Sequence, residues 1–412
     1  MIDVATAGLR DRLAGELPRL TDRVVALAEI NSGSRNPAGV DRVGDRLGEM
    51  VGQLAPDSIE RIEVDPTPGI DDAGAATTHP VGRALRAVKR PDAPFQVCLF
   101  GHLDTVFPAD DPFQAVTVDG ARLAGPGVAD CKGGLVLALE VLAHLDTVPW
   151  GSEIGWEYLV VPDEEIGSIG SKPLLREAAA AADLGLGFEP ALPSGGVAAA
   201  RKGSVSGHLI VRGVAAHVGR AHRDGRSAIL ALSRLIAELE AHNARDGVTV
   251  NCGRITGGGA LNVVPDLAIG SFNLRVEAPT DQTWIQDRFA EAATAASEDG
   301  VEVELRWAST RPPKVRTPAL DRILADVTAA GAALGVAIDP EDTGGCCDGN
   351  DLAAAGLTNV DSLGIAGGGI HSPAEFAMID SVPPRAATVA EVIRRAAARA
   401  AATPSDHGRR DG

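Results

Sequence analysis

Side chains of the types that bind divalent metal ions occur at four places in the first half of the sequence. They are His102 with Asp104, then Asp130, then the adjacent Glu164 and Glu165, and finally Glu189. Gaps of 28, 34 and 25 residues separate His102, Asp130, Glu164 and Glu189. Such gaps suit strand–helix–strand units, and ligands of open α/β sheets bind at the carboxyl ends of the strands. We therefore expect these carboxylates to converge on one edge of a sheet.

One histidine among several carboxylates would collect like charge unless cations neutralise it. Imidazole nitrogen and carboxylate oxygen suit zinc, and related divalent metals use the same ligands. A second histidine, His371, follows a run of glycines in "AGGGIHSPAEF" and could supply a further ligand of the cluster. A surface loop acid is the simpler interpretation of Glu189 taken alone. The recurrence of such residues at successive strand ends favours a metal site.

The predicted element that precedes a motif, rather than the motif alone, identifies these candidate ligands. The pentapeptide "HLDTV" occurs at 102–106, after an apolar strand pattern, and again at 144–148, at the end of a helical pattern. A histidine in a last helical turn is explained by the helix dipole or by solvent. We therefore assign no chemistry to His144.

The elements around these residues predict an α/β fold. Helical patterns at about 7–30 and 37–54 open the chain, and a hairpin with an Asp-Gly turn is predicted at 115–126. Apolar runs then alternate with helical patterns, which predicts an open, mostly parallel sheet covered by helices. The predicted strands are 95–100, 156–161 and 184–188, and the predicted helices are 132–145 and 169–182.

From about residue 197 the pattern changes to two-faced strands of the antiparallel kind. Helices at 226–243 and 281–298 alternate with four strands, which predicts a small inserted α+β domain. We predict a first catalytic segment at 1–196, the insertion at 197–311 and a second catalytic segment at 312–412. The last segment ends in a helix at 383–401 and a tail, from about 403, that is expected to be disordered.

Composition narrows the class of protein. At 412 residues the chain predicts two or three domains, and its net charge of −18 argues against nucleic-acid or anionic-membrane partners. The number of cysteines, five, is odd, and two of them, Cys346 and Cys347, are adjacent. This pattern does not indicate a framework of disulfide bonds. The N-terminus has no apolar signal-peptide core, and no apolar run is long enough to span a bilayer. A cytoplasmic location is expected.

Seven motifs resemble those of the di-zinc metallopeptidases that include aminoacylase, acetylornithine deacetylase, succinyl-diaminopimelate desuccinylase and glutamate carboxypeptidase. They run in order from about residue 95 to the final helix: "GHLDTV", "GPGVADCKGG", "PDEEIGS", "GFEP", "AAHVGR", "GGCCDGND" and "GGGIHSPAEF". The resemblance implies a zinc-peptidase type catalytic domain with an inserted lid or dimerisation domain. It also implies two divalent metal ions, with zinc as the expected metal. Asp130 would bridge them, His102 and Glu189 would complete one site, and Glu165 and His371 would complete the other.

The resemblance implies further roles. Asp104 would orient the His102 imidazole, and Glu164 would be the general base. His217 would steady the oxyanion, often in the partner subunit's active site across a homodimer formed through the insertion. Arg275 and Asn262 would grip the substrate, the arginine by its carboxylate.

The leading hypothesis is a metal-dependent hydrolase of an amide bond next to a free carboxylate. Its small-molecule substrate would be a peptide or an N-acyl amino acid, cleaved by a carboxypeptidase or an amidohydrolase. The alternative is a non-catalytic relative that binds metal or peptide, although all the ligands and the base are present. A cysteine nucleophile, Cys346 or Cys347 with His371, is also conceivable. Neither cysteine lies at a recognisable nucleophile elbow or helix start.

Overall fold

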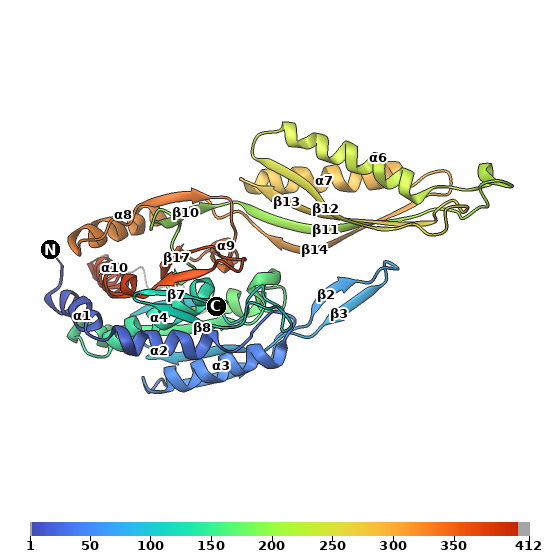
Figure 1. The fold of residues 1–412 in the computed structure, drawn as a ribbon. Coiled ribbons are helices and arrows are strands. Elements are labelled where there is room, and N and C mark those ends of the chain that lie inside the picture. The colour runs from blue at the N-terminus through green and yellow to red at the C-terminus, as the bar shows by residue number, and fades with distance from the viewer. Residues whose placement is uncertain (1, 403–412) are drawn as a thin grey trace.

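A computed structural model describes residues 2–402, so the tail predicted from about residue 403 lies outside the described residues. Figure 1 shows a larger body, which contains both ends of the described chain, and a smaller layer above it, formed by a sheet with α6 and α7 on its outer side. Each has its own hydrophobic core.

The larger body is built on a six-stranded sheet with the order β1-β4-β8-β5-β9-β16. The neighbours from β8 to β16 pair in parallel, and β1 and β4 are antiparallel additions at one edge. Every residue of β8 is buried, as expected of a strand covered on both faces. The predicted mostly parallel sheet is thus confirmed. Its strands are β1 (Ser58–Ile62), β4 (Ala84–Lys89), β5 (Phe95–His102), β8 (Ile154–Val161), β9 (Leu184–Gly187) and β16 (Asn359–Val360).

Helices pack on this sheet, and one prediction about them was wrong. The pattern at 7–30 forms two helices rather than one, because Gly15 ends the first and Pro18 occupies the first turn of the second. Gly134 allows α4 to approach the strand edge, since a Cβ there would lie 2.0 Å from the carbonyl oxygen of Phe188. The helices are α1 (Val4–Ala14), α2 (Leu17–Ala28), α3 (Pro37–Gly52), α4 (Gly133–Leu145), α5 (Lys172–Ala181), α8 (Pro318–Ala333), α9 (Asp348–Ala354) and α10 (Val382–Ala402).

Residues 203–311, which we call the insertion, form the antiparallel sheet β12-β13-β11-β14 with two helices on one face. Apolar side chains such as Leu209 and Phe272 fill the space under the helices, while Ser206 and His208 alternate with them on the opposite face. The predicted two helices on a four-stranded sheet are confirmed, and the exact boundaries at 197 and 311 stay a prediction. The elements are β11 (Gly203–Arg212), α6 (Ala228–Glu240), β12 (Val248–Gly257), β13 (Leu267–Val276), α7 (Pro279–Ala296) and β14 (Glu302–Arg311).

Three smaller sheets complete the described chain. The predicted Asp-Gly hairpin is confirmed as β6 (Thr117–Asp119) and β7 (Arg122–Ala124), which join β18 (Phe376–Met378) and β17 (Ala366–Gly368). The other pairs are the hairpin β2 (Thr67–Ile70) with β3 (Ala76–His79), and β10 (Val197–Arg201) with β15 (Pro340–Thr343). Short helical turns are η1 (Val128–Lys132), η2 (Pro149–Glu153), η3 (Glu164–Ile166), η4 (His222–Asp224), η5 (Ala241–Ala244) and η6 (Ile379–Ser381). No helix among residues 2–402 has the length and apolar character needed to cross a membrane.

One buried carboxylate ties together the two connections between the insertion and the larger body. Asp361 accepts from Arg201 Nε at 2.6 Å and from Lys314 Nζ at 2.7 Å, and all three residues are buried. Arg201 precedes the insertion and Lys314 follows it, and their backbones also exchange two hydrogen bonds. Burial alone would raise the pKa of Asp361, but Arg201 and Lys314 hold it below its usual value.

Replacing Asp361 with Ala is expected to lower the free energy of unfolding by about 3–5 kcal/mol, because two buried cations would lose their partner. Chemical unfolding followed by circular dichroism measures this loss, and Asp342→Ala, at an exposed position, is the control. An Asp361→Ala protein as stable as the control would show that the three charges contribute little.

Candidate metal centre and active site

The structure brings the five predicted metal ligands together as two triads that share Asp130. In each triad the potential ligand atoms lie within 4.8 Å of one another. Asp130 Oδ1 is 3.0 Å from His102 Nε2, and Asp130 Oδ2 is 3.3 Å from His371 Nε2. Glu189 Oε1 lies 3.9 Å from His102 Nε2, and Glu165 Oε2 lies 3.2 Å from His371 Nε2. The predicted convergence is therefore present in the fold.

Strand ends position most of these side chains. His102 is the last residue of β5, Glu189 follows β9, and Glu165 lies in η3 just after β8. Asp130 lies in η1, between β7 and α4, at backbone angles that depart from helix. His371 lies in the loop between β17 and β18, at φ +61°, so that loop turns sharply where the imidazole meets the cluster.

Burial and mutual repulsion dominate the electrostatics of the cluster. Burial raises the pKa of Glu165 to about 8 and raises the pKa of Glu189 well above its usual value. Against burial, His102 and His371 lower the pKa of Asp130, and hydrogen bonds to Asp130 and Glu165 raise that of His371 to about 10. Glu189 Oε1 is also buried without a hydrogen-bonding partner among the described residues. Nitrogen and oxygen donors in this arrangement fit two divalent cations, one in each triad.

Asp104 connects the imidazole of His102 to the turn that carries both glutamates. Its Oδ1 lies 3.4 Å from His102 Nδ1, and its two carboxylate oxygens accept the backbone N–H groups of Glu164 and Glu165 at 3.0 and 3.2 Å. Ser34 donates to the same carboxylate at 2.7 Å. This arrangement is compatible with the orienting role expected for Asp104, whose carboxylate lies beside the imidazole and accepts backbone amide groups.

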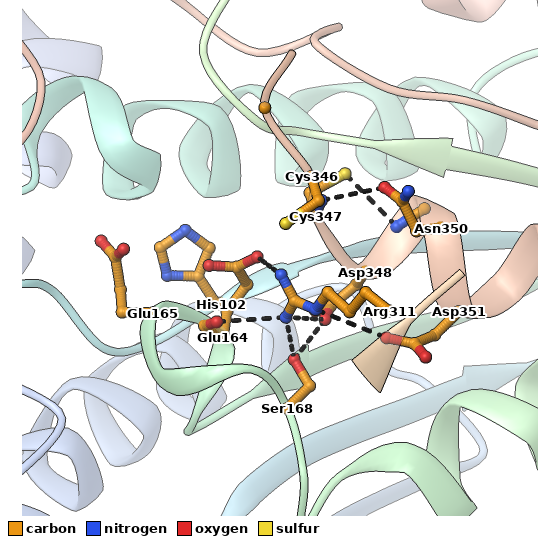
Figure 2. Close-up of polar contacts among 12 residues, drawn as sticks. His102, Glu164, Glu165, Ser168, Arg311, Cys346, Cys347, Asp348, Asn350 and Asp351 are labelled. Carbon is orange, nitrogen blue, oxygen red and sulfur yellow. Dashed lines mark hydrogen bonds and ion pairs between the residues drawn. The ribbon is translucent and has the colours of Figure 1, made fainter. Parts of the chain in front are cut away.

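Glu164 contacts a residue that comes from the insertion. Figure 2 shows its carboxylate directed at Arg311, the last residue of β14, while the Glu165 carboxylate points away from Arg311. Arg311 also donates to the Glu164 carbonyl oxygen at 3.1 Å, to Ser168 Oγ at 2.5 Å and to Asp348 Oδ1 at 3.1 Å. It is buried, so the insertion reaches the turn that holds Glu164 through a fully desolvated guanidinium.

Sequence reasoning missed Arg311 and also missed Glu375. The Glu375 carboxylate accepts the backbone N–H groups of Gly127, Ala129 and Asp130 at 3.0–3.1 Å, which fixes the loop that presents Asp130. In the sequence, Glu375 could have been recognised as an acidic residue close to a predicted ligand, since it lies four residues after His371. Arg311 is the last residue of the insertion as predicted, and no motif of the sequence marked it.

A cavity of about 580 Å³ opens over the cluster and is lined from the other side by the insertion. Arg275 faces this cavity, and its Nη1 lies 3.2 Å from Cys346 Sγ. The expectation that neither cysteine lies at a helix start was wrong for Cys347, which is the N-cap of α9 and whose sulfur accepts the Gly349 N–H. Cys347 is buried, and burial raises the pKa of its thiol. That thiol serves the helix start, which disfavours Cys347 as a nucleophile.

Two predicted residues are not brought to the cluster. His217 and Asn262 lie together in exposed loops of the insertion, where the Val218 N–H donates to the Asn262 carbonyl oxygen at 3.0 Å. Neither residue lines the cavity above the metal ligands of its own chain. Their roles stay predictions.

Comparison with known proteins agrees with this geometry. Residues 98–395 match the model of peptidase family M20/M25/M40. Carboxypeptidase G2 from Pseudomonas sp. is 30% identical over 312 residues, which cover 72% of this chain and 72% of that protein. A succinyl-diaminopimelate desuccinylase from Pseudomonas fluorescens is 27% identical over 297 residues, covering 67% of this chain and 76% of that protein.

Solved structures show the same fold. A tripeptidase from Staphylococcus aureus superposes with a TM-score of 0.72 at 24% identity, covering 93% of this chain and 99% of that one. An M20 family metallo-carboxypeptidase from Sulfolobus solfataricus gives 0.70 at 17% identity, covering 91% and 98%. The family match spans most of the chain, and the chain belongs to peptidase family M20/M25/M40.

Proposed function

We propose that the protein is a hydrolase that uses two divalent metal ions, with zinc as the expected metal, to cleave an amide bond next to a free carboxylate. One observation carries this proposal: two triads of ligands share Asp130 in the cavity that also contains Glu164 and Arg275. The relatives include a carboxypeptidase and a desuccinylase, so both peptides and N-acyl amino acids are candidate substrates.

We assign the binding of the metal ions and the transfer of protons to different residues. His102, Asp130 and Glu189 would hold one ion, and Asp130, Glu165 and His371 the other. When bound, such ions polarise a carbonyl group and lower the pKa of a water molecule. Glu164 accepts the proton of the attacking water and returns a proton to the departing amine. Arg311 holds the Glu164 side chain at the wall of the cavity where this exchange would occur.

Arg275 supplies recognition of the substrate. Its guanidinium lines the cavity opposite the ligands, where it can pair with a substrate carboxylate through two parallel hydrogen bonds. His217 and Asn262 lie outside this cavity, which supports a homodimer in which the insertion presents them to the partner's site. The location that we propose is cytoplasmic, on the basis of an odd number of cysteines that includes an adjacent pair.

Replacing Glu164 with Gln is expected to lower kcat by about 10²- to 10⁴-fold while both metal ions stay bound, because Gln cannot accept the proton. Amine release and elemental analysis of the same sample measure the two effects. Glu302→Gln, at an exposed position of β14, is the control. Full activity of Glu164→Gln would refute this mechanism, and a protein that binds substrate without releasing amine would be the non-catalytic relative.

Replacing Arg275 with Ala is expected to lower kcat/KM for free-acid substrates by about 10- to 100-fold, since a hydrogen bond to a charged group contributes about 1.5–3 kcal/mol. C-terminal amides of the same substrates should be hydrolysed slowly and equally by both proteins. Arg234→Ala, on the exposed side of α6, controls for loss of charge. An equal loss on acids and amides would argue against a carboxylate grip.

A further inference from the structure

A second cavity, of about 440 Å³, lies beside the catalytic one, between the hairpin β2–β3 and the insertion. Ile166, Ser206 and Ser309 line both cavities, so the two meet at these residues. Ile166 directly follows the metal ligand Glu165. The second cavity therefore begins next to the cluster and extends away from it along the insertion. Figure 1 shows the hairpin rising from the larger body toward this face of the insertion.

A continuous strip of polar side chains joins the two cavities. Three successive cross-strand pairs of β11 and β13 form it: Ser204 with Arg275, Ser206 with Asn273, and His208 with Ser271. The first two pairs face the catalytic cavity, and His208 and Ser271 face the second. These positions alternate with the apolar residues under the helices, so the strip follows from the two-residue period of the strands.

Seven side chains with a hydroxyl or imidazole group line the second cavity, beside the charged side chains of Arg35, Asp71, Asp72 and Arg254. His208 Nδ1 lies 3.0 Å from Ser271 Oγ, and its other ring nitrogen has no partner among residues 2–402. Burial, then the charges of Arg306 and Arg254, lower the pKa of His208, which keeps the ring neutral near pH 7. On the hairpin wall the hydroxyl of Thr67, a residue only 3% exposed, is buried without a hydrogen-bonding partner in the described chain.

The hairpin tip closes the far end of this cavity. Arg212 and Arg306 of the insertion donate to the carbonyl oxygens of Ala73 and Gly74 at 3.1 and 3.3 Å. Arg254 pairs with Asp72 of the hairpin at 3.0 Å, on the exposed rim of the cavity. The cavity is thus a bounded groove whose free groups are mostly hydroxyls and imidazoles.

We propose that this groove binds the peptide chain on the amino-terminal side of the scissile bond, so that the enzyme is a carboxypeptidase acting on oligopeptides. This inference rests on the proposed function. A peptide backbone presents alternating N–H and C=O groups, and hydroxyl and imidazole groups can satisfy both kinds. The strip from Arg275 to Ser271 covers four strand positions, about 13 Å. A substrate held by its carboxylate at Arg275 therefore needs about four residues to reach His208.

The test compares peptides of increasing length on the metal-loaded protein. Two series are used, N-acetyl-glutamate and N-acetyl-leucine, each extended at its amino end by one, two, three or four glycines. We expect kcat/KM to rise at least about tenfold as the chain grows to about four residues and then to level off. His208→Leu should lose most of that gain, with N-acetyl-amino-acid hydrolysis unchanged. Thr67→Val tests the opposite wall, and His222→Leu, which lines neither cavity, is the control.

The outcomes separate this inference from the proposed function. Acetyl-amino acids cleaved as fast as the tetrapeptides would overturn the groove assignment and leave the hydrolase intact. An increase of kcat/KM with peptide length that persists in both His208→Leu and Thr67→Val would also overturn it. Cleavage of the acetyl-amino acids but of no longer peptide would overturn the groove assignment and leave the hydrolase intact. If no member of either series is cleaved, the proposed function fails, and calorimetric binding of the same series decides the groove. Binding at least about tenfold tighter for tetrapeptides, lost in His208→Leu, would support the groove, and equal binding at all lengths would overturn it.

Discussion

Repulsion among buried carboxylates is the constraint on which the rest of this structure depends. Asp130 lies within a few ångströms of both Glu165 and Glu189 at the wall of the cavity, and burial disfavours the charged forms of these two glutamates. Two histidines offset part of that charge, and divalent cations would offset the remainder. Much of the surrounding architecture holds these groups together against repulsion. Asp104 fixes the turn of Glu164 and Glu165, and Glu375 fixes the loop of Asp130.

The insertion participates in the site as well as covering it. Arg311 contacts Glu164 directly, and Asp361 locks the two connections through which the insertion leaves and returns. The position of the polar strip relative to the cluster is therefore set by the buried ion pairs of Asp361 at the two connections and by the hairpin tip at the far end. A groove held at both ends suits recognition of an extended substrate, because little of its shape has to form on binding.

The sequence was informative wherever a local pattern determined the outcome. Alternating apolar runs and helical patterns predicted the parallel strands β5, β8 and β9, and strand ends then predicted the convergence of His102, Glu165 and Glu189. The residues that were missed act through tertiary contacts. Arg311 and Glu164 are 147 residues apart, and Glu375 and Asp130 are 245 residues apart. The hairpin β2–β3 was also missed, since its short strands carry no apolar alternation.

The central claim is that two cations occupy the two triads with Asp130 between them. Crystals of the zinc-loaded protein, measured on both sides of the zinc absorption edge, test it directly. The account predicts two anomalous peaks about 3.5–4 Å apart, one beside His102 and Glu189 and one beside Glu165 and His371. A single peak, or peaks away from Asp130, would contradict it.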